Sequence, residues 1–155
     1  MGRVLKEGKI VIVLRGRFAG KKGVIVRVHE EGSDDRRYPH AVVAGIEQYP
    51  RKITRAMESN RSDATKKSKI SKKSRVKPFV KHINLNHLMP TRYNLDLVAQ
   101  LKGTLDDATL LDSEKLVRAK RQVKKSMEER YQHLDSGKSE KAQAGAQFFF
   151  RRLRF

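Results

Sequence analysis

Two β-rich apolar runs separated by a glycine-rich loop constrain this chain more than any other feature. Residues 9–14 and 22–28 are dominated by valine and isoleucine, which favour strands. The loop between them holds Gly16 and Gly20, and Gly23 lies near the start of the second run. Glycines accept a positive φ and allow the backbone to approach other groups closely. The segment therefore predicts two strands joined by a tight turn.

The same loop is strongly basic. Its four cations are Arg15, Arg17, Lys21 and Lys22. We expect all four on one exposed turn, where they can meet a phosphate chain without reading bases. The strand–loop–strand pattern resembles the KOW motif, a unit of ribosomal and transcription-elongation proteins. That resemblance implies a small barrel whose partner is RNA.

The overall charge indicates the same kind of partner. The 155 residues include 36 lysines and arginines against 17 aspartates and glutamates, which gives a formal net charge of +19. A surplus of this size opposes compaction unless a polyanion neutralises it, so nucleic acid is the expected partner. Hydrophobic residues make up 37% of the chain, below the usual share of roughly 45–50%. We therefore expect one domain with extensions rather than a core that spans the whole chain.

Cysteine is absent from the chain, which excludes disulfides and cysteine-ligated zinc. Its absence fits a reducing compartment. No stretch approaches the ~20 apolar residues of a membrane span, and no secretory signal is evident. The five histidines form no zinc-ligand pair at helical spacing. We expect no cofactor, no metal and no membrane partner.

An enzymatic interpretation finds little support. Residues 16–22 resemble a phosphate-binding P-loop, but the spacing is one residue short and Lys22 stands where a magnesium-binding Ser or Thr is needed. Acidic pairs such as Glu30 with Glu31 lie in loop-like stretches rather than in a convergent site. We expect no catalytic residue and no small-molecule substrate.

Short strands separated by turn signals predict a mainly β fold. Besides the first two runs, residues 41–46 and 79–85 favour strands, and residues 52–56 are a weaker candidate. Pro90 is expected to end regular structure. Several short strands of this kind indicate a small barrel rather than parallel strands with helices between them.

Composition divides the chain into a barrel, an insertion and an extension. We expect the barrel in residues 1–56 and 79–86, interrupted by a flexible basic insertion over residues 57–78. The insertion has few apolar residues, so it cannot offset its ordering entropy alone, but it can become ordered on RNA. Residues 87–155 form a basic extension.

The extension contains a predicted amphipathic helix over residues 113–134. Asp112 can cap its N-terminus, and Gly137 follows as a C-terminal stop signal. Its apolar stripe predicts packing on the barrel or on a partner rather than on a membrane surface. The chain ends in an aromatic and basic tail, residues 148–155, which can either plug the core or dock on RNA or a neighbouring protein.

Longer segments resemble one family closely. They are residues 35–46, 49–52, 84–93, 128–131 and 149–155. Together they resemble the eukaryotic large-subunit ribosomal protein L27e family over nearly the whole chain. The resemblance implies an SH3-like barrel with basic extensions that is structural rather than catalytic. It also implies large-subunit rRNA and neighbouring ribosomal proteins as partners, and a cytoplasmic location with a nucleolar assembly stage.

The expected mechanism is phosphate binding combined with a fit to the shape of folded RNA. The alternative function is a KOW-type regulatory factor that binds RNA or a polymerase. The residues expected to contact RNA are Lys9, Arg15, Arg17, Lys21, Lys22, Arg51, Lys52, Lys66, Lys67, Lys69, Lys72, Lys73, Arg75, Lys77, His87, Arg92, Tyr93, Arg118, Lys120, Arg121, Lys124, Lys125, Arg151, Arg152 and Arg154.

Overall fold

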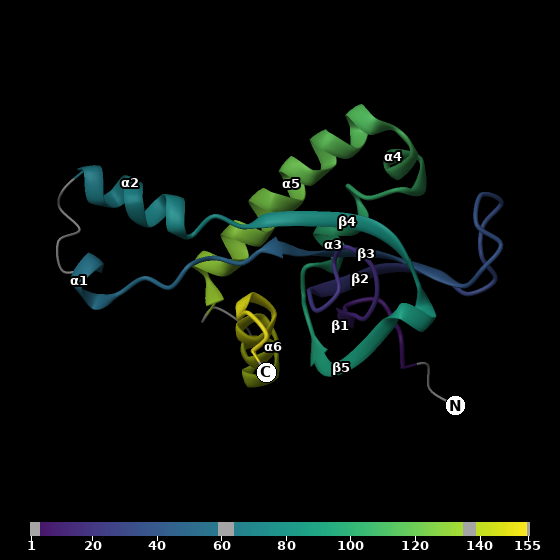
Figure 1. Ribbon diagram of the computed structural model, residues 1–155, viewed down its shortest axis with the longest axis horizontal. Coiled ribbons are helices and arrows are strands. Elements are labelled where there is room, and N and C mark those ends of the chain that lie inside the picture. The colour runs from purple at the N-terminus through teal and green to yellow at the C-terminus, as the bar shows by residue number, and fades with distance from the viewer. Residues whose placement is uncertain (1–3, 59–63, 135–138, 155) are drawn as a thin grey trace.

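A curved antiparallel sheet of five strands forms the centre of the molecule (Figure 1). The computed structural model describes residues 4–58, 64–134 and 139–154. The strands are β1 (Lys9–Val13), β2 (Lys22–His29), β3 (His40–Gln48), β4 (Lys77–Asn84) and β5 (Leu88–Asn94). Their order in the sheet is β4-β3-β2-β1-β5, so β5 pairs with β1 at the far side from β4. The prediction of a mainly β, barrel-like domain is confirmed.

Helices occupy the insertion and the C-terminal part of the chain. They are α1 (Arg55–Glu58), α2 (Ala64–Lys73), the 3₁₀ helix η1 (Leu85–His87), α3 (Val98–Lys102), α4 (Asp107–Leu111), α5 (Ser113–Gln132) and α6 (Glu140–Phe150). Figure 1 shows α5 and α6 beside the sheet, whereas α1 and α2 project away from it. The predicted C-terminal helical extension is confirmed.

Both faces of the sheet are buried. Val11, Ile25 and Phe79 belong to a cluster on one face, whereas Ile10 and Val24 belong to a second cluster on the opposite face. Successive side chains of a strand point to opposite faces. Burial on both sides therefore explains why the first two runs are continuously apolar instead of alternating with polar residues.

The C-terminal helices complete the second cluster. Leu101 comes from α3, Val123 and Met127 come from α5, and Phe149 and Phe150 come from α6. The hydrophobic core therefore reaches from β1 to α6, but among the described residues it includes none from α1 or α2, in line with the expectation that no core spans the whole chain. The C-terminal helices join the core despite the low apolar fraction of the chain, because their apolar residues are concentrated on the faces that meet the sheet.

The long helix α5 follows its sequence signals. The Asp112 carboxylate accepts hydrogen bonds from the backbone N–H groups of Glu114 and Lys115, at 2.9 and 3.4 Å, and so caps the first turn. The helix ends at Gln132, two residues before the predicted boundary. The expected stop at Gly137 lies outside the described residues.

The insertion differs from the expectation. Residues 52–56 form no strand, and α1 begins at Arg55. The Arg51 N–H donates to the Lys73 carbonyl at 2.8 Å, which joins the segment before α1 to the end of α2. The helix α2 occupies residues 64–73, where no regular structure was expected. Lysine and alanine favour helices, which explains why this polar stretch can adopt one.

Regular structure also continues through Pro90, contrary to expectation. This proline lies in β5 opposite Val11 of β1. Because β5 is an edge strand with a neighbour on one side only, the missing proline N–H is tolerated there. The pairing of β1 with β5 also shifts register between Lys9 and Val11. The sheet therefore extends past the expected boundary at residue 86, to Asn94.

Candidate nucleic-acid interface

The loop between β1 and β2 is a tight, hydrogen-bonded turn. Gly16 has φ +91° and Gly20 has φ +75°, the left-handed conformation that favours glycine. The Gly20 N–H donates to the Val13 carbonyl at 2.7 Å, and the Lys21 N–H donates to the Phe18 carbonyl at 3.0 Å. The positive φ that the sequence predicted for Gly16 and Gly20 is confirmed.

Gly23 serves a different purpose from the other two glycines. A Cβ atom at this position would collide with the side chain of Val43 on the neighbouring strand. The residue therefore allows β2 and β3 to approach closely, as the sequence pattern also allowed.

Phe18 anchors the middle of the loop. Its side chain is 6% exposed and stacks on Phe79 with ring centroids 4.1 Å apart. The Arg17 guanidinium lies 4.9 Å from the Phe18 ring centroid. With the loop anchored in this way, Arg15 and Arg17 are both exposed on its outer side.

Lys22 does not belong to this exposed set. Its side chain is 1% exposed, and its Nζ donates to the carbonyls of Phe148 and Arg151 at 2.5 and 2.6 Å. Burial, together with the positive charge of Arg151, lowers the pKa of Lys22 to about 8. The expectation that all four loop cations lie on one exposed turn is wrong, because Lys22 begins β2 and lies beneath the end of α6.

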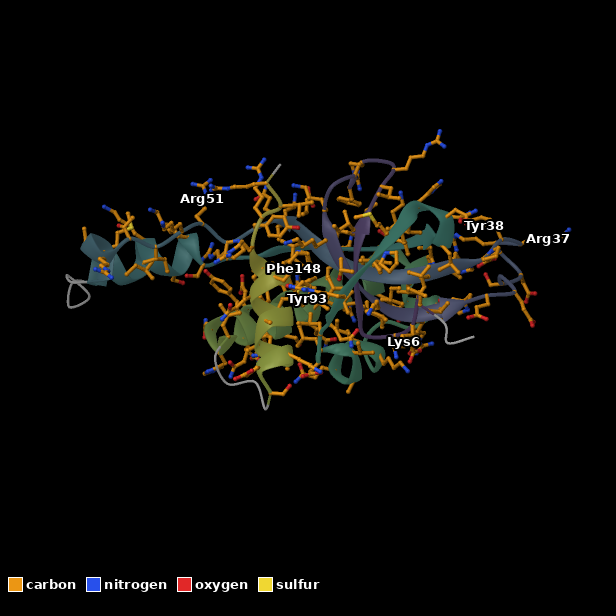
Figure 2. The ribbon with its side chains drawn as sticks, turned by 90° about the horizontal axis from the view of Figure 1, so that it is seen from below. Lys6, Arg37, Tyr38, Arg51, Tyr93 and Phe148 are labelled. Atoms are coloured by element: carbon orange, nitrogen blue, oxygen red, sulfur yellow. The ribbon has the colours of Figure 1, made fainter. Side chains whose placement is uncertain are left out.

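Aromatic residues of the tail pack inward. Phe149 and Phe150 are 0% and 4% exposed, so they plug the core, one of the two alternatives for the tail. Phe148 stacks on Tyr93 with ring centroids 4.5 Å apart, and Figure 2 shows these two residues together near the middle of the molecule. Arg92 lies against the same tyrosine, 5.0 Å from the ring centroid. Tyr93, an expected RNA contact, therefore has partners within the protein.

A glycine brings α6 against β5. A Cβ atom at Gly145 would collide with the carbonyl oxygen of Asn94. The start of α6 is fixed by Ser139, whose hydroxyl accepts a hydrogen bond from the Ala142 N–H at 3.3 Å. Sequence reasoning missed this helix, although the serine cap and the following alanines were local signals for it.

The other expected RNA contacts are distributed over much of the surface. Lys77, Lys124 and Lys125 pair with Glu47, Glu128 and Glu129, at 3.0, 3.8 and 4.0 Å. The side chains of Lys66 and Lys67 lie outside the described residues. Half-buried members of the set are Lys9, Lys21, Lys73, His87, Tyr93, Lys120 and Lys124. Exposed members are Arg15, Arg17, Arg51, Lys52, Lys69, Lys72, Arg75, Lys77, Arg92, Arg118, Arg121, Lys125, Arg151, Arg152 and Arg154.

Three histidines meet across the sheet, an arrangement that the sequence did not reveal. His40 stacks on His29 with centroids 4.8 Å apart and meets His82 edge-on at 5.4 Å. Burial is the main reason why the pKa of His82 falls to about 4. The strand register that pairs His29 with His40 and Val42 with His82 brings them together. In the described part of the chain, no group of three acidic, histidine or cysteine residues could hold a metal ion.

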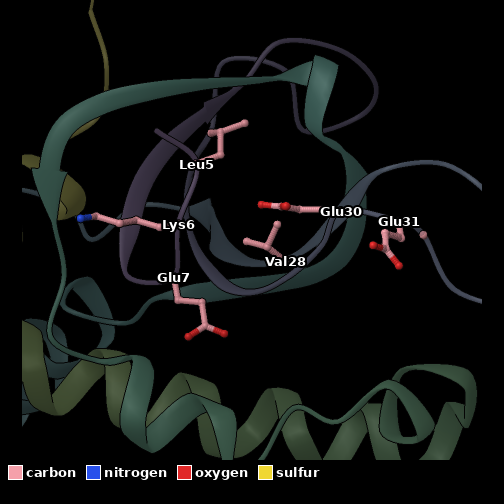
Figure 3. A pocket seen from close by; sticks show the side chains of 7 residues that line it. Leu5, Lys6, Glu7, Val28, Glu30 and Glu31 are labelled. Carbon is pink, nitrogen blue, oxygen red and sulfur yellow. The ribbon is translucent and has the colours of Figure 1, made fainter. Parts of the chain in front are cut away.

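An acidic hollow lies elsewhere on the surface (Figure 3). It measures about 660 Å³, and Glu7, Glu30 and Glu31 line it together with Lys6 and the apolar residues Leu5 and Val28. Carboxylates repel phosphate groups, so this hollow is unsuited to nucleic acid. Three carboxylates of this strongly basic chain thus gather at residues outside the β1–β2 loop.

None of the helices in the described ranges is both long and apolar enough to cross a membrane.

The curved sheet, the basic loop and the packed C-terminal helices define a class of small, strongly basic β-barrel proteins with helical extensions. Within this class, the chain belongs to the ribosomal L27e protein family, whose sequence model matches residues 10–155. It is similar to proteins named large ribosomal subunit protein eL27 from Candida albicans and Caenorhabditis elegans, which are 43% and 42% identical. It is 46% identical to eL27B from Schizosaccharomyces pombe, and each match covers 155 residues and the full length of both chains. The family resemblance seen in the sequence is confirmed.

Proposed function

We propose that this protein is a structural constituent of the cytosolic large ribosomal subunit and that it binds and stabilises rRNA through basic residues. Relatives that match its full length are named as large ribosomal subunit proteins. The observation that carries the RNA part is the rigid β1–β2 loop, which presents Arg15 and Arg17 to solvent. Neither arginine forms an ion pair with any residue that the structure describes.

Phosphate neutralisation supplies the binding free energy in this proposal. Each lysine or arginine that meets a phosphate releases condensed counterions, which favours association at moderate salt. Arginine adds a planar set of donors that can hold two phosphate oxygens at once. The Arg17 guanidinium lies 4.9 Å from the Phe18 ring centroid, but neither Arg15 nor Arg17 donates a hydrogen bond to a residue that the structure describes, so both keep this capacity.

The charge distribution also suggests how the protein is oriented. The basic loop faces rRNA, and the acidic hollow lined by Glu7, Glu30 and Glu31 faces away from phosphate. Neighbouring ribosomal proteins are the expected partners on surfaces that do not meet rRNA. The protein performs no catalysis in this proposal, binds no small molecule, and works in the cytoplasm after an assembly stage in the nucleolus.

Co-sedimentation tests this function against the alternative of a KOW-type regulatory factor. We expect the protein to be present at one copy per large subunit and to remain there at moderate salt. Release at moderate salt together with co-purification of a polymerase would instead support the regulatory alternative. The double variant Arg15→Gln, Arg17→Gln is expected to reduce incorporation into large subunits while the isolated protein keeps its melting temperature.

A further inference from the structure

A second hollow lies beside the basic loop. It measures about 380 Å³ and is formed by the β1–β2 loop, the segment before β3, and the junction of β4 with η1. Arg15 and Arg17 line it from the loop, Tyr38 from the segment before β3, and Lys81 and Asn84 from β4. Residues distant in the sequence thus converge on one concave site, of a size typical of ligand pockets.

The charge of this hollow has one sign. Arg15, Arg17 and Lys81 are exposed cations, and no carboxylate is among its lining residues in the described chain. The acidic hollow differs, because Glu7, Glu30 and Glu31 line it together with Lys6. Two cations on the loop and one on β4 suit a ligand that carries more than one phosphate group.

The walls of the hollow suit a flat apolar group. Tyr38 is 42% exposed, and its ring meets His40 edge-on at 5.7 Å, which leaves much of the tyrosine surface open. The buried side chains of Phe18 and Ile83 supply apolar surface below. Nucleobases that are unstacked from RNA are commonly received on exposed aromatic rings of this kind.

Asn84 adds polar groups of fixed orientation. Its side-chain oxygen accepts a hydrogen bond from the Asn86 N–H at 2.9 Å and so caps η1. This bond leaves the two amide N–H donors of Asn84 for an acceptor on a bound group. Amide side chains recognise the edges of bases through such donors.

Backbone hydrogen bonds hold the three walls together. The Leu14 N–H donates to the His87 carbonyl at 2.9 Å, which joins the loop to η1. The Leu85 N–H donates to the Pro39 carbonyl at 3.2 Å, which joins η1 to the segment that carries Tyr38. The hollow is therefore preformed, and a ligand entering it does not have to order these segments first.

We propose that this hollow receives one unstacked nucleobase of the bound RNA, while Arg15, Arg17 and Lys81 hold the phosphates on either side of it. The inference rests on the proposed function, because it needs RNA at the basic loop. It adds a site for a single-stranded or bulged nucleotide to a surface that would otherwise contact only the backbone of RNA.

The test compares two short RNA duplexes that differ only by one bulged 4-thiouridine. We expect the full-length protein to bind the bulged duplex about 10-fold more tightly than the perfect one, as for one stacked base. Crosslinks from the bulged base are expected in the peptides that contain Tyr38 or residues 81–87. Tyr38→Ala should abolish the preference without changing affinity for the perfect duplex, and Tyr38→Phe should retain it.

A matched control is Leu111→Ala, which removes an exposed apolar side chain on α4 and should leave the preference unchanged. Equal wild-type affinity for the two duplexes, with steep salt dependence, would overturn the base site but leave the proposed function standing. Preserved preference in Tyr38→Ala would also overturn it. Failure of the wild type to bind either RNA would instead contradict the proposed function itself.

Discussion

At the scale of single residues, Lys22 joins the first hairpin to the end of the chain. Its ammonium group donates to two carbonyls at the C-terminus of α6 and lies 3.8 Å from the Phe148 ring centroid. The β2 backbone N–H of the same residue donates to the Tyr49 hydroxyl at 2.9 Å. A cation held at a helix C-terminus in this way stabilises the free carbonyls there. Lys22 thus stabilises the fold, and the exposed cations of the loop are Arg15 and Arg17, with Lys21 half-buried.

Gly20 gives the first prediction. Its φ of +75° is strained for a β-branched residue, although a Cβ atom there would meet nothing within 4 Å. Gly20→Val should therefore destabilise the fold by roughly 1 to 3 kcal/mol through the backbone alone. Urea unfolding measures the change in stability. Ala19→Ser is the control, because it leaves the backbone conformation of the loop unchanged. Unchanged stability in Gly20→Val would show that the loop can relax into another conformation.

His82 gives a prediction about pH. Its pKa lies near 4 in the folded protein because burial disfavours the charged form; Arg36, His40 and His29 lower it further, and Asp107 opposes them. The ordinary histidine pKa of 6.5 applies to the unfolded chain, so the unfolded state binds more protons between these values. Stability should therefore fall as the pH drops from 6.5 towards 4, by at most about 3 kcal/mol.

The variant His82→Gln isolates this contribution. It should be less sensitive to pH than the wild type over the interval from 6.5 to 4, because Gln takes up no proton in either state. Urea unfolding at several pH values measures the difference. The same loss of stability in both proteins would assign the acid sensitivity to other groups.

At the scale of elements, α6 behaves as part of the core. Phe149 is 0% exposed, whereas Phe148 is half-buried against Tyr93. Phe149→Ala should therefore cost about 3 to 5 kcal/mol of unfolding free energy, the usual range for a buried phenylalanine. Phe148→Ala should cost less, because its ring is partly in solvent already. Equally small losses in the two variants would mean that α6 is undocked in solution.

The helix α2 is expected to behave differently. It projects away from the sheet (Figure 1) and has ten residues, Ala64–Lys73. Helices shorter than ~12–15 residues are marginal in water without tertiary packing. Amide exchange of the free protein should therefore show fast exchange in α2 and strong protection in β1 and β2. Bound to RNA, α2 should become protected. Strong protection of α2 in the free protein would contradict its independence from the core.

At the scale of the whole molecule, local patterns predicted what depends on neighbours in sequence. The first hairpin follows from its β-branched runs and glycines, and α5 follows from its apolar stripe and the Asp112 cap. The course of β5 through Pro90 depended on its place at the sheet edge, which no local pattern reveals. The burial of Lys22 depends on carbonyls 126 and 129 residues away. The same holds for the hollow beside the loop, whose walls come from distant segments.

The position of charge in the folded molecule gives the last prediction. Each phosphate neutralised by the protein adds about 0.7 to 0.9 to the slope of log K against log salt. Arg15→Gln combined with Arg17→Gln should therefore reduce the slope by about 1.4 to 1.8 if both arginines meet phosphate.

A double variant at the acidic hollow, Lys6→Gln with Lys102→Gln, removes the same formal charge next to Glu7. That control should leave the slope near the wild-type value, because its cations lie beside carboxylates rather than on the basic loop. Filter binding over a range of potassium chloride concentrations measures both slopes. Equal reductions in the two variants would mean that RNA responds to net charge alone, and the oriented interface built on the β1–β2 loop would have to be abandoned.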